Sequence, residues 1–163
     1  TGLVMRQTAF TAPMSGSAGG GMLWWWKQIN AYDFYGNVTP AIEYFKLLPD
    51  DFVKMDSLDY EDYVFSHANQ SLASKGRVLG FISDTAVYAY LFDTRYNYGN
   101  PNPGAIENSA LSFSLSDGEY EVKVFDTQNG GVTKTFSAQA KNGKLELALD
   151  AWSRDTAFII VKK

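Results

Sequence analysis

Three consecutive tryptophans, Trp24 to Trp26, follow the glycines Gly19 to Gly21, with only Met22 and Leu23 between them. An indole buries on the order of 150–250 Å² when it packs, so three in a row need a partner surface. A short run that is apolar on both faces and bounded by glycine is typical of a strand buried on both sides in a parallel sheet. A buried helical turn is the alternative, but the aromatic residues and the preceding glycines favour a strand over residues 19–26.

The segments on either side of this run favour helices. Residues 6–17 are predicted as a helix rich in small side chains, which Pro13 weakens. Residues 32–37 form a loop of polar and aromatic residues, and Pro40 then lies in the first turn of a second helix that ends near residue 48. The order helix, buried strand, aromatic loop, helix makes residues 1–50 a short α/β segment.

Residues 51–62 are acidic and polar, and we interpret them as a linker. From about residue 63 the apolar residues recur with a period of two, which indicates β-strands. Seven short strands joined by turns predict an antiparallel β-sandwich over residues 63–163, so the fold class is mainly β. The strands are expected at about residues 77–83, 85–92, 109–115, 119–126, 132–138, 144–149 and 155–162.

The alternation is regular in several of these strands. Tyr120, Val122 and Val124 share one face of their strand, and charged residues take the other. Leu145 and Leu147 alternate with charged or small residues in the same way. This pattern predicts sheets that are apolar on one side and solvated on the other.

Composition excludes several classes of function. A net charge of −4 without a basic stripe argues against a nucleic-acid partner, and the longest apolar run is too short to span a membrane. With no cysteine and a single histidine, His67, we expect no metal and no cofactor. The acidic residues of the linker, or Asp93 with Asn97, could ligate calcium, but linker and turn positions explain them more simply. No pair of carboxylates can be nominated as a catalytic acid and nucleophile.

One connection, residues 94–107, is far longer than a hairpin needs. It carries Tyr96 and Tyr98 among several amides. Sugar rings have apolar faces that stack on aromatic side chains and hydroxyls that bond to amides, so this loop is a candidate carbohydrate site. The alternative is that the tyrosines only fix the loop against the rest of the fold.

The sequence resembles the C-terminal end of a bacterial cellulase-like (β/α)8 glycoside hydrolase, continued into that enzyme's C-terminal β-sandwich. Residues 15–26, Ser-Gly-Ser-Ala-Gly-Gly-Gly-Met-Leu-Trp-Trp-Trp, are similar to the family's last barrel strand and the small residues before it. The sandwich part is similar at residues 117–120, 125–127, 143–147 and 155–158. The order of these short motifs carries the resemblance.

This resemblance implies that the run Trp24, Trp25 and Trp26 provides a sugar-stacking platform. It does not identify which of the three indoles stacks on the sugar. Tyr32 and Tyr35 of the following loop, with Tyr96 and Tyr98, complete the candidate substrate-binding residues. In such enzymes the two catalytic glutamates come from earlier strands, which would precede Thr1. The residues of this chain therefore do not decide whether it belongs to an enzyme.

We expect the C-terminal portion of a polysaccharide-degrading hydrolase that is secreted or held on a bacterial surface. Its expected partners are a polysaccharide or oligosaccharide and the preceding barrel portion of the same protein. The alternatives are a non-catalytic carbohydrate-binding or adhesion module and a purely structural accessory domain.

Overall fold

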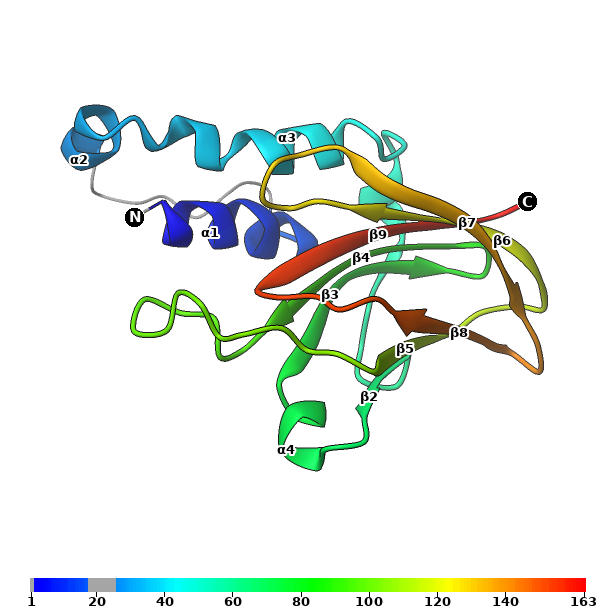
Figure 1. Cartoon of the computed structure of the whole chain (residues 1–163). Helices are drawn as coiled ribbons and strands as arrows, with labels where there is room; N and C mark the ends of the chain where they lie inside the picture. The colour runs from blue at the N-terminus through cyan, green and yellow to red at the C-terminus, as the bar shows by residue number, and fades with distance from the viewer. Residues whose placement is uncertain (1, 18–25) are drawn as a thin grey trace.

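A computed structural model, which describes residues 2–17 and 26–163, places two antiparallel β-sheets face to face under a layer of helices (Figure 1). The larger sheet has the strand order β1-β3-β4-β9-β6-β7, and the smaller has the order β2-β5-β8. The mainly β, antiparallel sandwich predicted from the sequence is therefore confirmed.

The helical elements come first along the chain. They are α1 (Leu3–Met14), α2 (Trp26–Ala31), η1 (Phe34–Asn37), α3 (Thr39–Phe45), η2 (Phe52–Lys54) and the later α4 (Gln70–Ala73), where η marks a 3-10 helix. The strands are β1 (Asp56–Ser57), β2 (Tyr63–His67), β3 (Gly76–Ser83), β4 (Ala86–Asp93), β5 (Ser109–Ser114), β6 (Gly118–Phe125), β7 (Val132–Ala140), β8 (Lys144–Leu149) and β9 (Asp155–Lys162).

The seven predicted strands correspond to β3 through β9, and two short strands were not predicted. The first, β1, lies within the acidic segment 51–62 and pairs Asp56 and Ser57 with Ile82 and Phe81 of β3. The second, β2, pairs with β5 at the edge of the smaller sheet. The acidic segment thus contributes an edge strand to the larger sheet.

The space between the two sheets is filled by the alternating side chains that the sequence pattern indicated. Tyr120 and Val122 of β6 are fully buried there, as are Leu145 of β8 and Leu111 of β5. The charged residues of β6 and β8 lie on the opposite faces, where Glu119 and Lys144 are exposed. A strict period of two fixes which face of each strand enters the core.

The solvated side that alternation predicts for β6 and β8 does not extend to the centre of the larger sheet. Every residue of β4 except Phe92 is buried. Val87 and Leu91 point into the sandwich, whereas Tyr88 and Tyr90 point outward against the helices. The reason is that α1 and α3 cover this outer face, so β4 is buried on both sides.

Aromatic side chains form most of the contact between the helices and the sheet. The ring of Phe10 in α1 stacks on Tyr90 with centroids 4.9 Å apart and lies 5.8 Å from Tyr44 of α3. The hydroxyl of Tyr44 donates a hydrogen bond of 2.9 Å to the carbonyl of Phe158 in β9. Burial of these rings attaches residues 1–50 to the sandwich.

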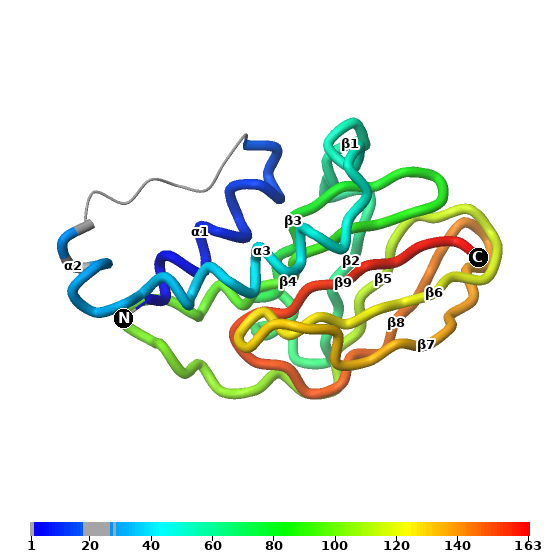
Figure 2. Tube along the Cα trace, turned by 90° about the horizontal axis from the view of Figure 1, so that it is seen from above, coloured from blue at the N-terminus to red at the C-terminus, as the bar shows by residue number. Residues whose placement is uncertain are grey.

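The two predicted helices of the α/β segment are present as α1 and α3, and they run in the same direction. Gly2, just before α1, lies against the side chain of Asn37, just before α3. Further along both helices, Phe10 lies beside Tyr44. Figures 1 and 2 show both helices leading from the end of the molecule that holds the N-terminus toward the strands.

The strand predicted over residues 19–26 falls almost entirely outside the described residues. The one exception is Trp26, which is the first residue of α2. Trp26 is therefore helical rather than extended, and α2 begins where the predicted strand ends.

We expect Phe10→Ala to lower the free energy of unfolding by about 3–5 kcal/mol, because it removes a fully buried ring from the helix–sheet contact. Ile42→Ala, on the exposed side of α3, is the matched control and should change it by less than about 1 kcal/mol. Urea denaturation measures both. Equal effects of the two substitutions would contradict this packing.

Candidate functional site

The structure describes four of the seven predicted substrate-binding side chains, and three of them are exposed. Tyr32, Tyr35 and Tyr98 are 68%, 56% and 80% exposed. Trp24 and Trp25 lie outside the described residues, and so does the side chain of Trp26. Both views place α2 and η1, with Tyr32 and Tyr35, at the same end of the molecule as the 94–107 loop (Figures 1 and 2).

The fourth, Tyr96, is only 5% exposed, so it has the structural role that was the alternative for this loop. Its hydroxyl accepts a hydrogen bond from Arg6 of α1, and its carbonyl accepts one of 3.0 Å from Gln7. The guanidinium carbons of Arg6 and Arg154 lie 5.3 and 5.7 Å from its ring centroid. Tyr96 thus holds the loop against α1 and leaves Tyr98 as its exposed ring.

Below Tyr96 lies a buried polar cluster centred on Asp155, the first residue of β9. Its carboxylate accepts hydrogen bonds of 2.9 Å from the hydroxyl of Tyr90 and 2.7 Å from the amide of Gln128, and another from Thr127. A terminal nitrogen of Arg6 lies 3.8 Å from this carboxylate. A buried charge requires such partners, so the cluster links α1, β4, β9 and the turn after β6.

Burial shifts the titration of the tyrosines around this cluster. It raises the pKa of Tyr90 well above the ordinary value of 10.0, and the nearby charge of Asp155 raises it further. Burial also raises the pKa of Tyr96, although the charge of Arg6 opposes that shift. Both hydroxyls therefore keep their protons at neutral pH.

The beginning of the 94–107 loop is held by an ion pair. The buried carboxylate of Asp93 accepts bonds of 2.9 and 2.7 Å from Arg95, and Asn97 closes a turn with Asn100. Within residues 2–17 and 26–163, no group of three or more histidine, aspartate or glutamate residues is placed to hold a metal ion. Among the helices described there, none has the length and apolar character needed to cross a membrane.

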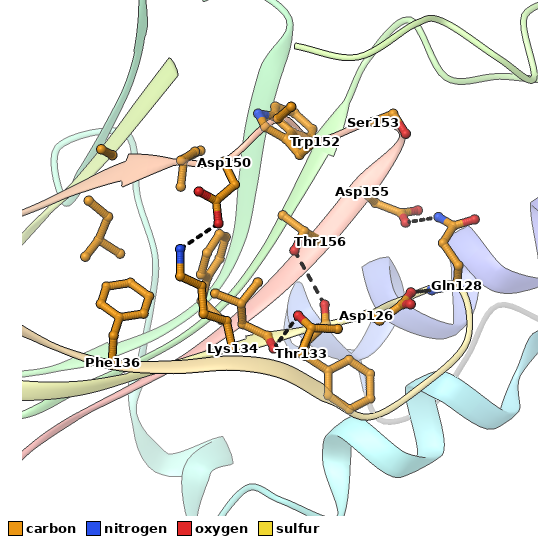
Figure 3. Close-up of a pocket in the computed structure, with 17 residues that line it drawn as sticks. Asp126, Gln128, Thr133, Lys134, Phe136, Asp150, Trp152, Ser153, Asp155 and Thr156 are labelled. Atoms are coloured by element: carbon orange, nitrogen blue, oxygen red, sulfur yellow. Dashed lines mark hydrogen bonds and ion pairs between the residues drawn. The ribbon is translucent and has the colours of Figure 1, made fainter. Parts of the chain in front are cut away.

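A cleft of about 300 Å³ opens between the two sheets, where β7 and the β8–β9 connection separate (Figure 3). Its interior is apolar and includes Phe136, Leu147 and Trp152. Its mouth is polar, and there Lys134 of β7 forms a 2.6 Å ion pair with Asp150. Sequence reasoning did not predict this cleft, whose residues come from three stretches of the chain, 124–128, 133–136 and 147–158.

Hydrogen bonds lower the pKa of one carboxylate that lines this cleft, that of Asp126. Burial alone would raise the pKa of Asp126, but hydrogen bonds from Asn129 and Gln128 outweigh it and hold the pKa below its usual range. Asp150 is paired with Lys134. The carboxylate of Asp126 is therefore a charged hydrogen-bond acceptor at neutral pH and is not poised to donate a proton.

Comparison with known proteins identifies no relative: no protein-family model matches the chain, and no curated protein matches it.

We predict that stability falls as the pH rises above about 10, because the buried tyrosines must lose protons on unfolding. Burial raises the folded-state pKa of Tyr44 well above 10.0, so between the two values the unfolded chain binds fewer protons. Stability then falls by about 1.4 kcal/mol per pH unit for each such group. Urea denaturation between pH 8 and 11 should show a shallower fall for Tyr44→Phe and an unchanged slope for Tyr98→Phe.

A second prediction separates the two tyrosines of the long loop. Tyr96→Ala should lower the free energy of unfolding by about 3–5 kcal/mol, because it removes a buried ring. The paired substitution Tyr98→Ala, at a position that is 80% exposed, should change it by less than about 0.5 kcal/mol. Thermal or urea denaturation measures both, and a stable Tyr96→Ala variant would refute the role assigned to this ring.

Proposed function

We propose that this chain is the C-terminal portion of a polysaccharide-degrading glycoside hydrolase. In this proposal it supplies an aromatic platform for a sugar ring and an accessory β-sandwich, while the catalytic glutamates belong to a preceding (β/α)8 portion. A polysaccharide is too large to enter a cell, so the proposed site of action is outside a bacterial cell or on its surface.

The observation that supports this proposal best is the direction of α1 and α3. Residues 15–38 connect α1 to α3, and they include the tryptophan run and α2. The two helices run parallel, as Gly2 beside Asn37 and Phe10 beside Tyr44 require. Consecutive helices of a (β/α)8 barrel are parallel because a strand returns between them. The tryptophan run occupies that position in the sequence.

The exposed aromatic side chains give further support. Tyr32 stacks on Phe34 with centroids 5.7 Å apart, and Tyr35 follows in the same 3-10 helix region. In a (β/α)8 enzyme, the residues that follow a strand line the active-site face. Exposed rings at this place would extend a sugar-binding surface begun by Trp24, Trp25 or Trp26.

The competing proposal is a carbohydrate-binding or adhesion module without hydrolytic chemistry. It is favoured by Tyr98, which is 80% exposed on a loop whose base is fixed by Tyr96 and Arg95. A rigid base with an exposed ring is suited to stacking on a sugar. Glycan binding by the chain alone that Tyr98→Ala abolishes, without hydrolysis by the longer protein, would favour this proposal.

The test is to express this chain together with the sequence that precedes it and to assay hydrolysis of β-glucan, mannan and xylan. Replacing the platform tryptophan, one of Trp24, Trp25 and Trp26, by alanine should lower kcat/KM about tenfold or more, because loss of a stacking aromatic typically costs over 1 kcal/mol.

Tyr60→Ala, at a ring that is 75% exposed between β1 and β2, is the matched control and should leave kcat/KM unchanged. Absence of βα units upstream, or failure to hydrolyse any of the three polymers, would overturn the proposal.

A further inference from the structure

We infer that the cleft between β7 and the β8–β9 connection is a second carbohydrate-binding site, which takes one or two pyranose rings of a neutral sugar. It lies between the two sheets of the sandwich, whereas Tyr32 and Tyr35 belong to the segment of α2 and η1 in the helical layer. The inference does not depend on hydrolytic activity, because the cleft consists entirely of residues 124–158 of the described chain.

The cleft exists because β7 and β8 belong to different sheets. The turn between them closes the sandwich at one end, where Ala140 is fully buried. Toward the other end the strands separate, and the burial of β7 decreases until Lys134 and Val132 are exposed. Alternation places Lys134 on the same side of β7 as Phe136, and Figure 3 shows its chain extending over the opening toward Asp150.

The walls of the cleft offer flat apolar surfaces. The indole N–H of Trp152 already donates a 3.1 Å hydrogen bond to the hydroxyl of Ser109, and the indole packs edge-on against Phe65. Trp152 is 8% exposed, so the small part of its ring that lines the cleft is an apolar surface in a fixed orientation. Phe136, half-buried on the facing strand, provides a second ring. The C–H face of a pyranose is complementary to such rings.

The mouth of the cleft carries both signs of charge within a short span. Lys134 offers an ammonium donor and Asp150 a carboxylate acceptor. Asp126 also lines the cleft, where its carboxylate accepts hydrogen bonds from Gln128 and Asn129. Ser153 and Thr133 add hydroxyl groups at the cleft. A hydroxyl both donates and accepts, so a neutral polyol can bond to all of these groups. A fatty acid or a phosphate would instead place its negative charge near two carboxylates.

The size of the cleft limits the ligand. A volume of about 300 Å³ is at the lower end of the range for small-molecule sites. It suits the end of a sugar chain rather than an extended stretch. The exposed Lys134–Asp150 pair contributes little to stability by itself, so exchanging its bonds for sugar hydroxyls costs the fold little.

The test is to titrate the 163-residue chain with cellobiose, mannobiose and xylobiose by calorimetry and by NMR of the tryptophan indole N–H groups. At least one disaccharide should bind with a dissociation constant of about 1 mM or below. Binding should shift the NMR signal of the Trp152 indole N–H. The spectrum of a Trp152→Phe variant identifies that signal, because the variant lacks it. Thr156→Phe, which fills the cleft, should weaken binding at least about tenfold.

Asp150→Ala provides a second variant that removes an exposed side chain and keeps the cleft open; it should weaken binding several-fold. Glu146→Gln is its matched control, because Glu146 forms a 2.5 Å exposed ion pair with Lys144 elsewhere on the smaller sheet. This control should bind as the unsubstituted chain does.

Three results would overturn the assignment: no binding of any disaccharide, binding that survives both cleft variants, or binding of decanoate in place of sugars. Loss of sugar binding in Tyr98→Ala with the cleft variants unaffected would place the site on the loop instead. These measurements test binding by this chain alone. A negative result would therefore overturn the cleft proposal without bearing on the proposed hydrolase, which the hydrolysis assays test.

Discussion

Burial of the larger sheet on both faces is the constraint on which the rest of this structure depends. β4 and β9 sit at its centre, and their side chains fill the sandwich on one side and contact the helices on the other. The helical contact is largely aromatic, with Phe10 stacked on Tyr90 and close to Tyr44. Removing the helices would expose a continuous apolar surface around these rings. The helices α1 and α3 and the sandwich are therefore parts of one packed structure.

The buried carboxylate of Asp155 fixes how these layers fit together. Its bonds to Tyr90 and Gln128 join β9 to β4 and to the turn after β6, and Arg6 adds α1. Apolar contacts tolerate small shifts, whereas a buried charge is strongly disfavoured once it loses its partners. The position of α1, and of the loop that Tyr96 holds against it, is thus set by polar geometry as well as by apolar contact.

The sequence predicted the parts of this fold that follow from local pattern, and it failed where distant segments combine. Alternation located β6 and β8 closely because one face of each is charged. It missed β1, because a strand of two exposed residues has no period to detect. It did not show that β4 is buried on both faces, because the helices that cover its outer face, α1 and α3, come from a distant part of the chain. Tyr96 and Tyr98 have the same local composition, and only Arg6, ninety positions away, distinguishes the buried ring from the exposed one.

The cleft raises the question of why a lysine faces inward on β7. β7 and β8 are both edge strands, and an inward charge on an edge strand hinders pairing with another chain. Hindering such pairing explains why β7 carries Lys134. It does not explain why Asp150 lies beside Lys134 or why aromatic side chains line the cleft behind the pair. An ion pair this exposed adds little stability, so stability does not explain the arrangement either. A ligand with apolar faces and hydroxyl edges uses the walls, the lysine and the carboxylates together, which is why we assign the cleft to a sugar.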